Sequence, residues 1–223
     1  RNPSLWHPDT PNLYRLRTSV YLNGKLCDAV VSRIGIRSIE FRGADGLYIN
    51  GKPFGDKLMG VNRHQDYAYI GNAVPNNLHW LDVKKMRDAG FRIIRSAHYP
   101  QDPAFMDACD ELGMFIIVAT PGWQYWNPEP VFEERILSDI RNMVRRDRNH
   151  PSVLLWEPVL NETAFPESFA QNAYRATHEE YPAPGCYAAI DDKSKGAMGY
   201  DVVYTAPKNE AFYRNAGKSC FTR

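Results

Sequence analysis

The sequence lacks the features that mark membrane-spanning, disulfide-rich and nucleic-acid-binding proteins. No run of about 18 apolar residues occurs, so no transmembrane helix is predicted. The formal net charge is +1, which gives no general attraction to nucleic acid or to an anionic membrane. The four cysteines are far apart and show no metal-binding or redox spacing. Free thiols in a packed interior are therefore predicted, rather than a disulfide framework.

The sequence also lacks an initiator methionine and a signal peptide, and it opens with Arg1-Asn2-Pro3. We expect the chain to be a segment of a longer protein, whose N-terminus with any signal peptide lies outside it. No compartment is predicted for this reason. The composition itself, with 43% hydrophobic and 24% charged residues, is that of a soluble globular protein.

Residues 1–41 have the pattern of β-strands. Apolar and polar residues alternate over 13–22, Asn23-Gly24 is a strong signal for a two-residue hairpin turn, and a second strand is predicted over 26–34. Another hairpin is predicted around the Asn50-Gly51 dipeptide. Two or three strands cannot close a sandwich alone, so we expect the partner sheet of residues 1–41 to lie outside this chain.

From Lys57 onwards, strand-like and helix-like segments alternate. Short apolar runs predict strands at 57–62, 91–95, 114–119, 153–156, 185–190, 201–205 and 218–223. Helices are predicted between the first five of them, at 79–89, 102–112, 130–146 and 168–180. Between the last strands, helices are short or missing. This alternation predicts a parallel sheet with right-handed crossovers, in either a barrel or a doubly wound form.

No glycine-rich phosphate loop follows the first of these strands, which argues against a nucleotide-binding doubly wound sheet. Polar residues instead follow the first four strands. The strand at 153–156 leads to Asn161-Glu162, and burying an amide and a carboxylate there is costly unless they face a cleft. In an α/β barrel, the carboxyl ends of the strands carry the active site. We therefore predict an α/β fold of the (β/α)8 type that stops before its last strand.

Two stretches, 95–100 and 147–162, resemble the signatures of the family 2 glycoside hydrolases, which include β-galactosidases and β-glucuronidases. The resemblance covers most of the chain. It implies that residues 1–41 are the last strands of an immunoglobulin-like sandwich domain and that 42–223 are an incomplete TIM-barrel catalytic domain. It also implies hydrolysis of terminal β-glycosidic bonds, most often of β-galactosides, by a retaining mechanism with two carboxylates.

The resemblance implies that Glu162 is the general acid/base and that Asn161 holds the 2-hydroxyl of the sugar. Neutral imidazole suits hydrogen bonding to sugar hydroxyls, a guanidinium can orient a carboxylate, and aromatic rings suit the apolar faces of a sugar. The predicted substrate-binding residues are His64, Arg95, His98, Trp123, Trp126 and Tyr204. The segment 118–120, Val-Ala-Thr, replaces the acidic residues that supply a magnesium ligand in galactosidases of the family. No metal and no other cofactor is therefore predicted.

The chain departs from the family pattern near Glu162. The family has five steps from the strand tryptophan to the glutamate, whereas Trp156 to Glu162 is six. We expect a bulge near Pro158 to absorb the additional residue. Glu157 is predicted to form an internal ion pair with Arg95. The nucleophile, which the resemblance places after the seventh strand, is expected beyond Arg223.

Two further classes of function stay open at this point. The altered spacing before Glu162, the missing metal residues and Gln65, where the family has a glutamate, are compatible with a non-catalytic carbohydrate-binding protein on a degenerate barrel. The unpaired strands of residues 1–41 are compatible with an assembly piece of a homo-oligomer. For the hydrolase and for the carbohydrate-binding protein, the predicted ligand is an oligosaccharide or a β-glycoside. Neither nucleic acid nor a membrane is a predicted partner.

Overall fold

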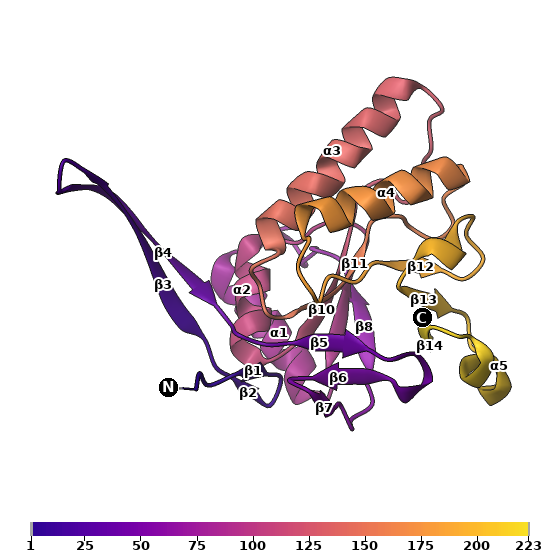
Figure 1. The fold of residues 1–223 in the computed structure, drawn as a ribbon, viewed down its shortest axis with the longest axis horizontal. Coiled ribbons are helices and arrows are strands. Elements are labelled where there is room, and N and C mark those ends of the chain that lie inside the picture. Colours follow the sequence, from indigo (N-terminus) through magenta and orange to yellow (C-terminus); the bar gives the residue numbers. More distant parts are fainter. Residues whose placement is uncertain (1, 223) are drawn as a thin grey trace.

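The computed structural model describes residues 2–222, which form an N-terminal set of antiparallel strands followed by an α/β part (Figure 1). The antiparallel units are the pair β1 (Trp6–His7) and β2 (Thr10–Pro11), the hairpin β3 (Tyr14–Leu22) and β4 (Lys25–Ile34), and the sheet β5 (Ile39–Phe41), β6 (Leu47–Ile49) and β7 (Lys52–Pro53). Both predicted hairpins are confirmed. Asn23 and Gly24 turn the first with φ angles of 49° and 78°, the left-handed values that a two-residue turn needs.

The β3–β4 hairpin stands away from the rest of the chain (Figure 1). Its apolar side chains are open to solvent, with Val20 and Val30 exposed by 56% and 57%. The base of the hairpin, in contrast, is tied to the α/β part, since Arg33 pairs with Asp107 at 2.9 Å and also with Glu111.

Seven parallel strands follow, in the order predicted from the sequence. They are β8 (Gly60–Arg63), β9 (Ile93–Ser96), β10 (Phe115–Ala119), β11 (Val153–Glu157), β12 (Ala189–Asp191), β13 (Val202–Thr205) and β14 (Ser219–Thr222). The first four form one sheet and the last three another, and an isolated parallel bridge from Trp156 to Ala188 joins the two. The first strand starts three residues later than predicted. Gly60 allows close pairing there, because a Cβ at this position would lie 2.6 Å from the carbonyl oxygen of Ile93.

The helices lie between the strands, as predicted. They are α1 (Asn76–Asp88), α2 (Pro103–Leu112), α3 (Pro130–Asp147), α4 (Glu167–Glu180) and the short α5 (Glu210–Asn215), with 3₁₀ turns at Gly43–Asp45 and Ala197–Gly199. The side chain of Asp102 caps α2 by accepting from the Ala104 amide at 2.8 Å, and Gly113 ends it at a φ of 69°. The start of α1, three residues before the predicted one, follows Pro75 and has no side-chain cap. No helix among residues 2–222 is both long and apolar enough to cross a membrane.

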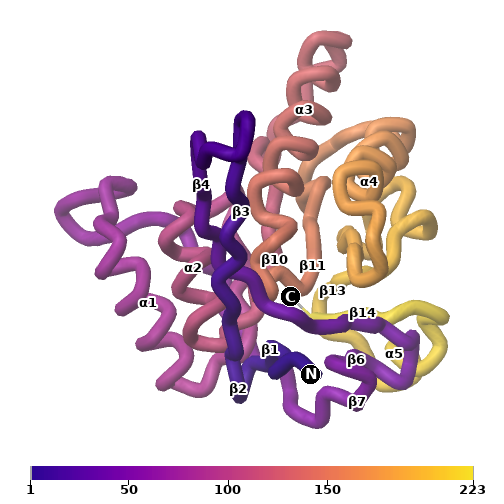
Figure 2. Tube along the Cα trace, turned by 60° about the vertical axis from the view of Figure 1, so that its left-hand side comes forward, coloured from indigo at the N-terminus to yellow at the C-terminus, as the bar shows by residue number. Residues whose placement is uncertain are grey.

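The strands have a helix-covered face and an inner face. Ile94, Ile116 and Val118 pack with residues of α1, α2 and α3, while Val203 packs with residues of α3 and α4. Figures 1 and 2 show α1 beside α2 and α3 beside α4. The inner face carries a third cluster to which no α-helix contributes, and in which Trp6, Ile39 and Ile49 close one end of the strands.

Strand β11 contains a bulge, but not where the sequence led us to expect it. The pairing with β10 slips between Ile116 and Ile117, which face Val153 and Leu155, so Leu154 is the additional residue. Leu154 and Leu155 consequently both join the inner cluster, whereas Trp156 points to the helices. The bulge thereby turns Glu157 toward the inner face. The expected bulge at Pro158 is wrong, because Pro158 lies outside the strand pairing.

The structure confirms the α/β class, with one parallel series of strands and helices on its outer face. Within residues 2–222, the outermost strands β8 and β14 do not pair with each other. A cavity of about 680 Å³ lies between them and is lined by both strands and by Leu58, Arg95 and Leu155. The last residue of the seventh predicted strand, Arg223, lies outside the described residues.

Candidate active site

The predicted site residues follow the carboxyl ends of neighbouring parallel strands. His64 follows β8, His98 follows β9, Trp123 lies in the loop after β10, and Asn161 and Glu162 follow β11. Because the strands are parallel, these ends meet at one edge of the sheet. This edge is opposite to the end closed by Trp6 and Ile49.

A buried network of charged and polar side chains lies just inside that edge. Arg95 donates from Nε to Oε2 of Glu157 at 2.7 Å and from Nη2 to Oε1 at 2.5 Å, and Glu157 is 0% exposed. The hydroxyl of Tyr204 donates to the same Oε1. The predicted ion pair between Glu157 and Arg95 is thus confirmed. Burial lowers the pKa of Arg95, but its hydrogen bond and ion pair with Glu157 outweigh burial, so the net pKa is raised.

Asn161 is attached to this network, whereas Glu162 is open. Nη2 of Arg95 also donates to Oδ1 of Asn161 at 2.9 Å, and Asn161 is 4% exposed. Glu162 is exposed and has a φ of 62°, in the left-handed region. Its Oε2 accepts from the side-chain amide of Gln124 at 3.1 Å. The Asn-Glu pair therefore combines a fixed amide with an accessible carboxylate.

Gln124 is a site residue that the sequence did not reveal. It lies in the loop after β10, and besides its contact with Glu162 its backbone amide donates to Oγ1 of Thr163 at 3.0 Å. Its φ of 60° is also left-handed. Neither the residue type nor its spacing gives a signal for this role, because the contact depends on how two separate loops meet.

His98 is held as a neutral imidazole. It stacks on Trp123 with ring centres 4.8 Å apart and an angle of 23°, and it meets His64 edge to face at 5.7 Å. Burial, with smaller contributions from the positive charge of Arg95 and from His64, lowers the pKa of His98 to about 4, although Glu162 acts in the opposite direction. Its Nδ1 is buried without a hydrogen-bond partner among residues 2–222.

Two of the predicted substrate-binding residues lie apart from the group formed by His64, His98 and Trp123. Trp126 packs on Phe169 of α4, with ring centres 4.6 Å apart, and on Phe132 of α3. Tyr204 is 1% exposed and buried against Glu157. Substrate binding by either residue stays a prediction, whereas His64, His98 and Trp123 lie together.

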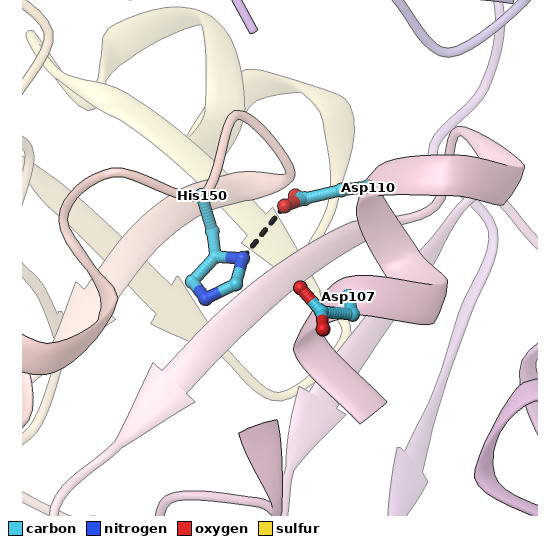
Figure 3. Close-up of side chains that lie close together, drawn as sticks. All are labelled: Asp107, Asp110 and His150. Atoms are coloured by element: carbon cyan, nitrogen blue, oxygen red, sulfur yellow. Dashed lines mark hydrogen bonds and ion pairs between the residues drawn. The ribbon is translucent and has the colours of Figure 1, made fainter. Parts of the chain in front are cut away.

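A second group of titratable residues has the composition of a metal site. Asp107, Asp110 and His150 have oxygen and nitrogen atoms within 4.8 Å of one another (Figure 3). Nδ1 of His150 is 2.6 Å from Oδ2 of Asp110, and Arg33 pairs with Asp107 at 2.9 Å. Because each of the two carboxylates already has a nitrogen partner, we assign the group to structural ion pairing. It precedes β11 and therefore lies at the opposite end of that strand from Glu162.

Comparison with known proteins gives two family matches. Residues 39–183 match the family described as "Glycosyl hydrolases family 2, TIM barrel domain". Residues 1–37 match the family described as "Glycosyl hydrolases family 2". The two matches together cover the antiparallel strands and the α/β part as far as the end of α4.

Similar individual proteins include a β-galactosidase of Thermoanaerobacter pseudethanolicus, which is 35% identical over 179 residues, or 80% of this chain and 24% of that protein. Among solved structures, a β-glycosidase from Bacteroides vulgatus matches 99% of this chain and 29% of its own, with a TM-score of 0.85 and 28% identity. A β-glucuronidase from Bacteroides uniformis matches 92% of this chain and 27% of its own, with a TM-score of 0.78 and 30% identity. The chain therefore spans about a quarter of the length of such relatives.

Proposed function

The chain belongs to glycosyl hydrolases family 2, and on that basis we propose that the protein containing it hydrolyses terminal β-glycosidic bonds with Glu162 as general acid/base. One observation carries this proposal. At the carboxyl end of β11, Asn161 is fixed by Arg95 while Glu162 stays accessible beside the loop that bears Trp123 and Gln124. An accessible carboxylate can protonate a bound leaving group, and the fixed amide beside it can hold the 2-hydroxyl of the sugar.

The proposed mechanism is a double displacement with retention of configuration. Glu162 protonates the glycosidic oxygen as the bond breaks, and its carboxylate then takes a proton from the attacking water. Neutral His98 bonds a sugar hydroxyl through its imidazole, and Trp123 covers an apolar face of the ring. The second carboxylate, which forms the glycosyl-enzyme intermediate, is expected from the segment after Arg223.

We propose that the α/β part, residues 42–223, is a (β/α)8 barrel lacking its last strand. Arg95, Glu157 and Tyr204 support this, because they come from the second, fourth and sixth parallel strands and meet on the inner face. Barrel interiors are built from such layers, to which alternate strands contribute. Residues 1–41 are proposed as the last strands of an immunoglobulin-like sandwich, and the exposed apolar side chains of the β3–β4 hairpin support a partner sheet there.

Among substrates, we propose β-galactosides, with β-glucuronides as the competing class. The β-galactosidase of Thermoanaerobacter pseudethanolicus supports the first and the β-glucuronidase of Bacteroides uniformis supports the second. A glucuronide carries a carboxylate at C6, and a binding site for it needs an available cation. Arg95, at the centre of the site, is already paired with Glu157, which favours the uncharged sugar.

The test is hydrolysis of a panel of p-nitrophenyl β-glycosides by the full-length gene product. We expect release of p-nitrophenol from the β-galactoside above all others, with retention of configuration at the anomeric carbon. Isothermal titration calorimetry with an intact oligosaccharide separates this from the carbohydrate-binding alternative, because a binding protein leaves the sugar uncleaved. Absence of hydrolysis from every glycoside in the panel, together with stable binding, would replace the proposal by that alternative.

A further inference from the structure

The buried carboxylate of Glu157 has no part in the mechanism above. It cannot reach a sugar in this arrangement, because it is 0% exposed and surrounded by Arg95, Tyr204 and the inner cluster. Burying a charged pair costs free energy that a well-packed apolar pair would not. What connects this pair to the site is its contact with Asn161, which Arg95 makes while it is bound to Glu157.

The chemistry of the two side chains fixes the orientation of the Asn161 amide. A guanidinium has only donors, so the atom of Asn161 that faces Nη2 of Arg95 at 2.9 Å must be the carbonyl oxygen Oδ1. The amide nitrogen Nδ2 then points to the other side. Among residues 2–222 this nitrogen has no hydrogen-bond partner, so both of its protons are available to a ligand.

Arg95 in turn is oriented by Glu157. The same Nη2 that reaches Asn161 also donates to Oε1 of Glu157 at 2.5 Å, and Nε donates to Oε2 at 2.7 Å. This two-point contact fixes the plane of the guanidinium. Tyr204, from β13, holds Oε1 on its other side. The bulge at Leu154 is what turns Glu157 inward to make these contacts.

We propose that Glu157 is a positioning residue that, through Arg95, presents the Asn161 amide as a hydrogen-bond donor to the 2-hydroxyl oxygen of the bound sugar. The inference rests on the proposed function, since it names how that site holds its substrate. The 2-hydroxyl contact strengthens in the transition state, so a misdirected amide reduces turnover more than binding. Glu157 itself touches no substrate.

The test compares a β-glycoside with its 2-deoxy analogue in the full-length protein. The measured quantity is kcat/KM for the β-glycoside divided by kcat/KM for its 2-deoxy analogue. Three variants are needed, Glu157→Gln, Asn161→Ala and the double variant. Asp147→Asn is the matched control, because Asp147 is also 0% exposed and paired with an arginine, Arg146, but lies at the end of α3.

We expect Glu157→Gln to lower this ratio by about 10²-fold, as a small displacement of a positioned group does. Asn161→Ala lowers it at least as far, and the double variant gives the same ratio as Asn161→Ala alone, because both act on one contact. Asp147→Asn leaves the ratio unchanged. A ratio in Glu157→Gln equal to that of the wild type, even with lower activity on both substrates, would overturn the inference and leave Glu157 as a structural residue.

A second readout keeps the inference separate from the proposed function. The side-chain amide of Asn161 is identified in ¹⁵N spectra by its absence in Asn161→Ala. We expect Glu157→Gln to shift this signal and Asp147→Asn to leave it in place. If the wild type hydrolyses no β-glycoside, the proposed function fails, and the amide signal alone then decides: an unshifted signal in Glu157→Gln would refute the positioning role.

Discussion

The two ends of strand β11 carry similar residues and differ in what those residues leave free. At the amino end of the strand, Asp110 of α2 is 2% exposed, and both of its oxygens accept hydrogen bonds from the residues before β11, Oδ2 from His150 at 2.6 Å and Oδ1 from the Ser152 amide at 3.0 Å. At the carboxyl end of the strand, its last residue Glu157 is equally buried and also hydrogen-bonded, by Arg95 and Tyr204. Buried charge alone thus does not distinguish the two ends.

The two ends differ in the carboxylates that neighbour these buried residues. Beyond Asp110, the neighbouring carboxylate of Asp107 is paired with Arg33. Beyond Glu157, in contrast, Glu162 is exposed, and its carboxylate accepts a side-chain hydrogen bond from Gln124. Both ends thus hold a satisfied buried carboxylate, and the accessible carboxylate of Glu162 is what marks the carboxyl end as a place for a ligand. Four predictions sharpen this contrast.

The largest effect is expected at the open end, from Glu162→Gln. Loss of the general acid lowers kcat/KM for an alkyl β-glycoside by about 10²–10⁴-fold. The loss is smaller for a p-nitrophenyl glycoside, because p-nitrophenolate leaves without protonation. Steady-state kinetics of the full-length protein measure both. Glu134→Gln, an exposed glutamate on α3, is the matched control and keeps wild-type rates. Equal losses on the two leaving groups would exclude an acid role for Glu162.

The next effect is expected at the satisfied end and concerns stability. Asp110→Ala leaves His150 and the Ser152 amide without their partner, which lowers the free energy of unfolding by about 3–5 kcal/mol. Asp107→Ala on the same helix removes a pair between half-exposed groups and costs less than about 1 kcal/mol. Calorimetry of the full-length protein compares the two. Comparable losses from both variants would contradict the assignment of Asp110 as the buried anchor.

The third prediction concerns two histidines that titrate in opposite directions. Burial lowers the pKa of His150, but the hydrogen bond to Asp110 and the nearby carboxylates raise it by more than burial lowers it. The pKa in the folded protein therefore exceeds the usual 6.5. The charged His150 ring therefore contributes its full stabilisation of the folded state below about pH 6.5, and this contribution is lost as the pH rises through the pKa of the folded protein. For His98, with a pKa of about 4, the unfolded chain binds the additional proton, so stability falls as the pH drops from about 6.5 to 4.

NMR titration of the histidine rings checks this contrast, with His150→Gln and His98→Gln assigning the signals. At pH 5.5 we expect a charged ring at His150 and a neutral ring at His98. Activity near neutral pH then does not depend on protonation of His98. A shared midpoint close to 6.5 for both rings would show that the two ends of β11 do not differ electrostatically.

The smallest effect is expected from Gln124→Asn. The shorter side chain tolerates the left-handed backbone but no longer reaches Glu162, so one exposed hydrogen bond worth about 0.5–1.5 kcal/mol is lost. This corresponds to a reduction in kcat/KM of about 2- to 10-fold. Gln171→Asn removes a similar contact, to Glu167 on α4, and should leave the kinetics unchanged. A change of the same size in both variants would argue against Gln124 as a site residue.

Much of the fold was predictable because its signals are local. The Asn23-Gly24 turn needs left-handed residues, and the cap at Asp102 and the stop at Gly113 delimit α2. The pairing of Glu157 with Arg95 was also predictable, because a carboxylate in an apolar strand needs a cation. The turn and the helix limits follow from a residue and its immediate neighbours, whereas the ion pair joins residues 62 positions apart and follows from the need of a buried carboxylate for a cation.

The features that the sequence did not reveal depend on contacts between distant segments. The bulge at Leu154, instead of Pro158, reflects how β11 pairs with β10. Trp123 and Trp126 have the same side chain, but only Trp123 meets His98, because Trp126 finds Phe169 on α4. Gln124 contacts Glu162 across two loops. No pattern within one segment separates such outcomes.

The unpaired sides of β8 and β14 have a practical consequence for handling this stretch of polypeptide. Each strand pairs with one neighbour only among residues 2–222, which leaves backbone amides and carbonyls on its other side ready to join a strand of another molecule. The lining between them, with Leu58, Ile93 and Phe221, is apolar and favours such association. Residues 1–223 produced in isolation would thus be prone to aggregation through these two strands.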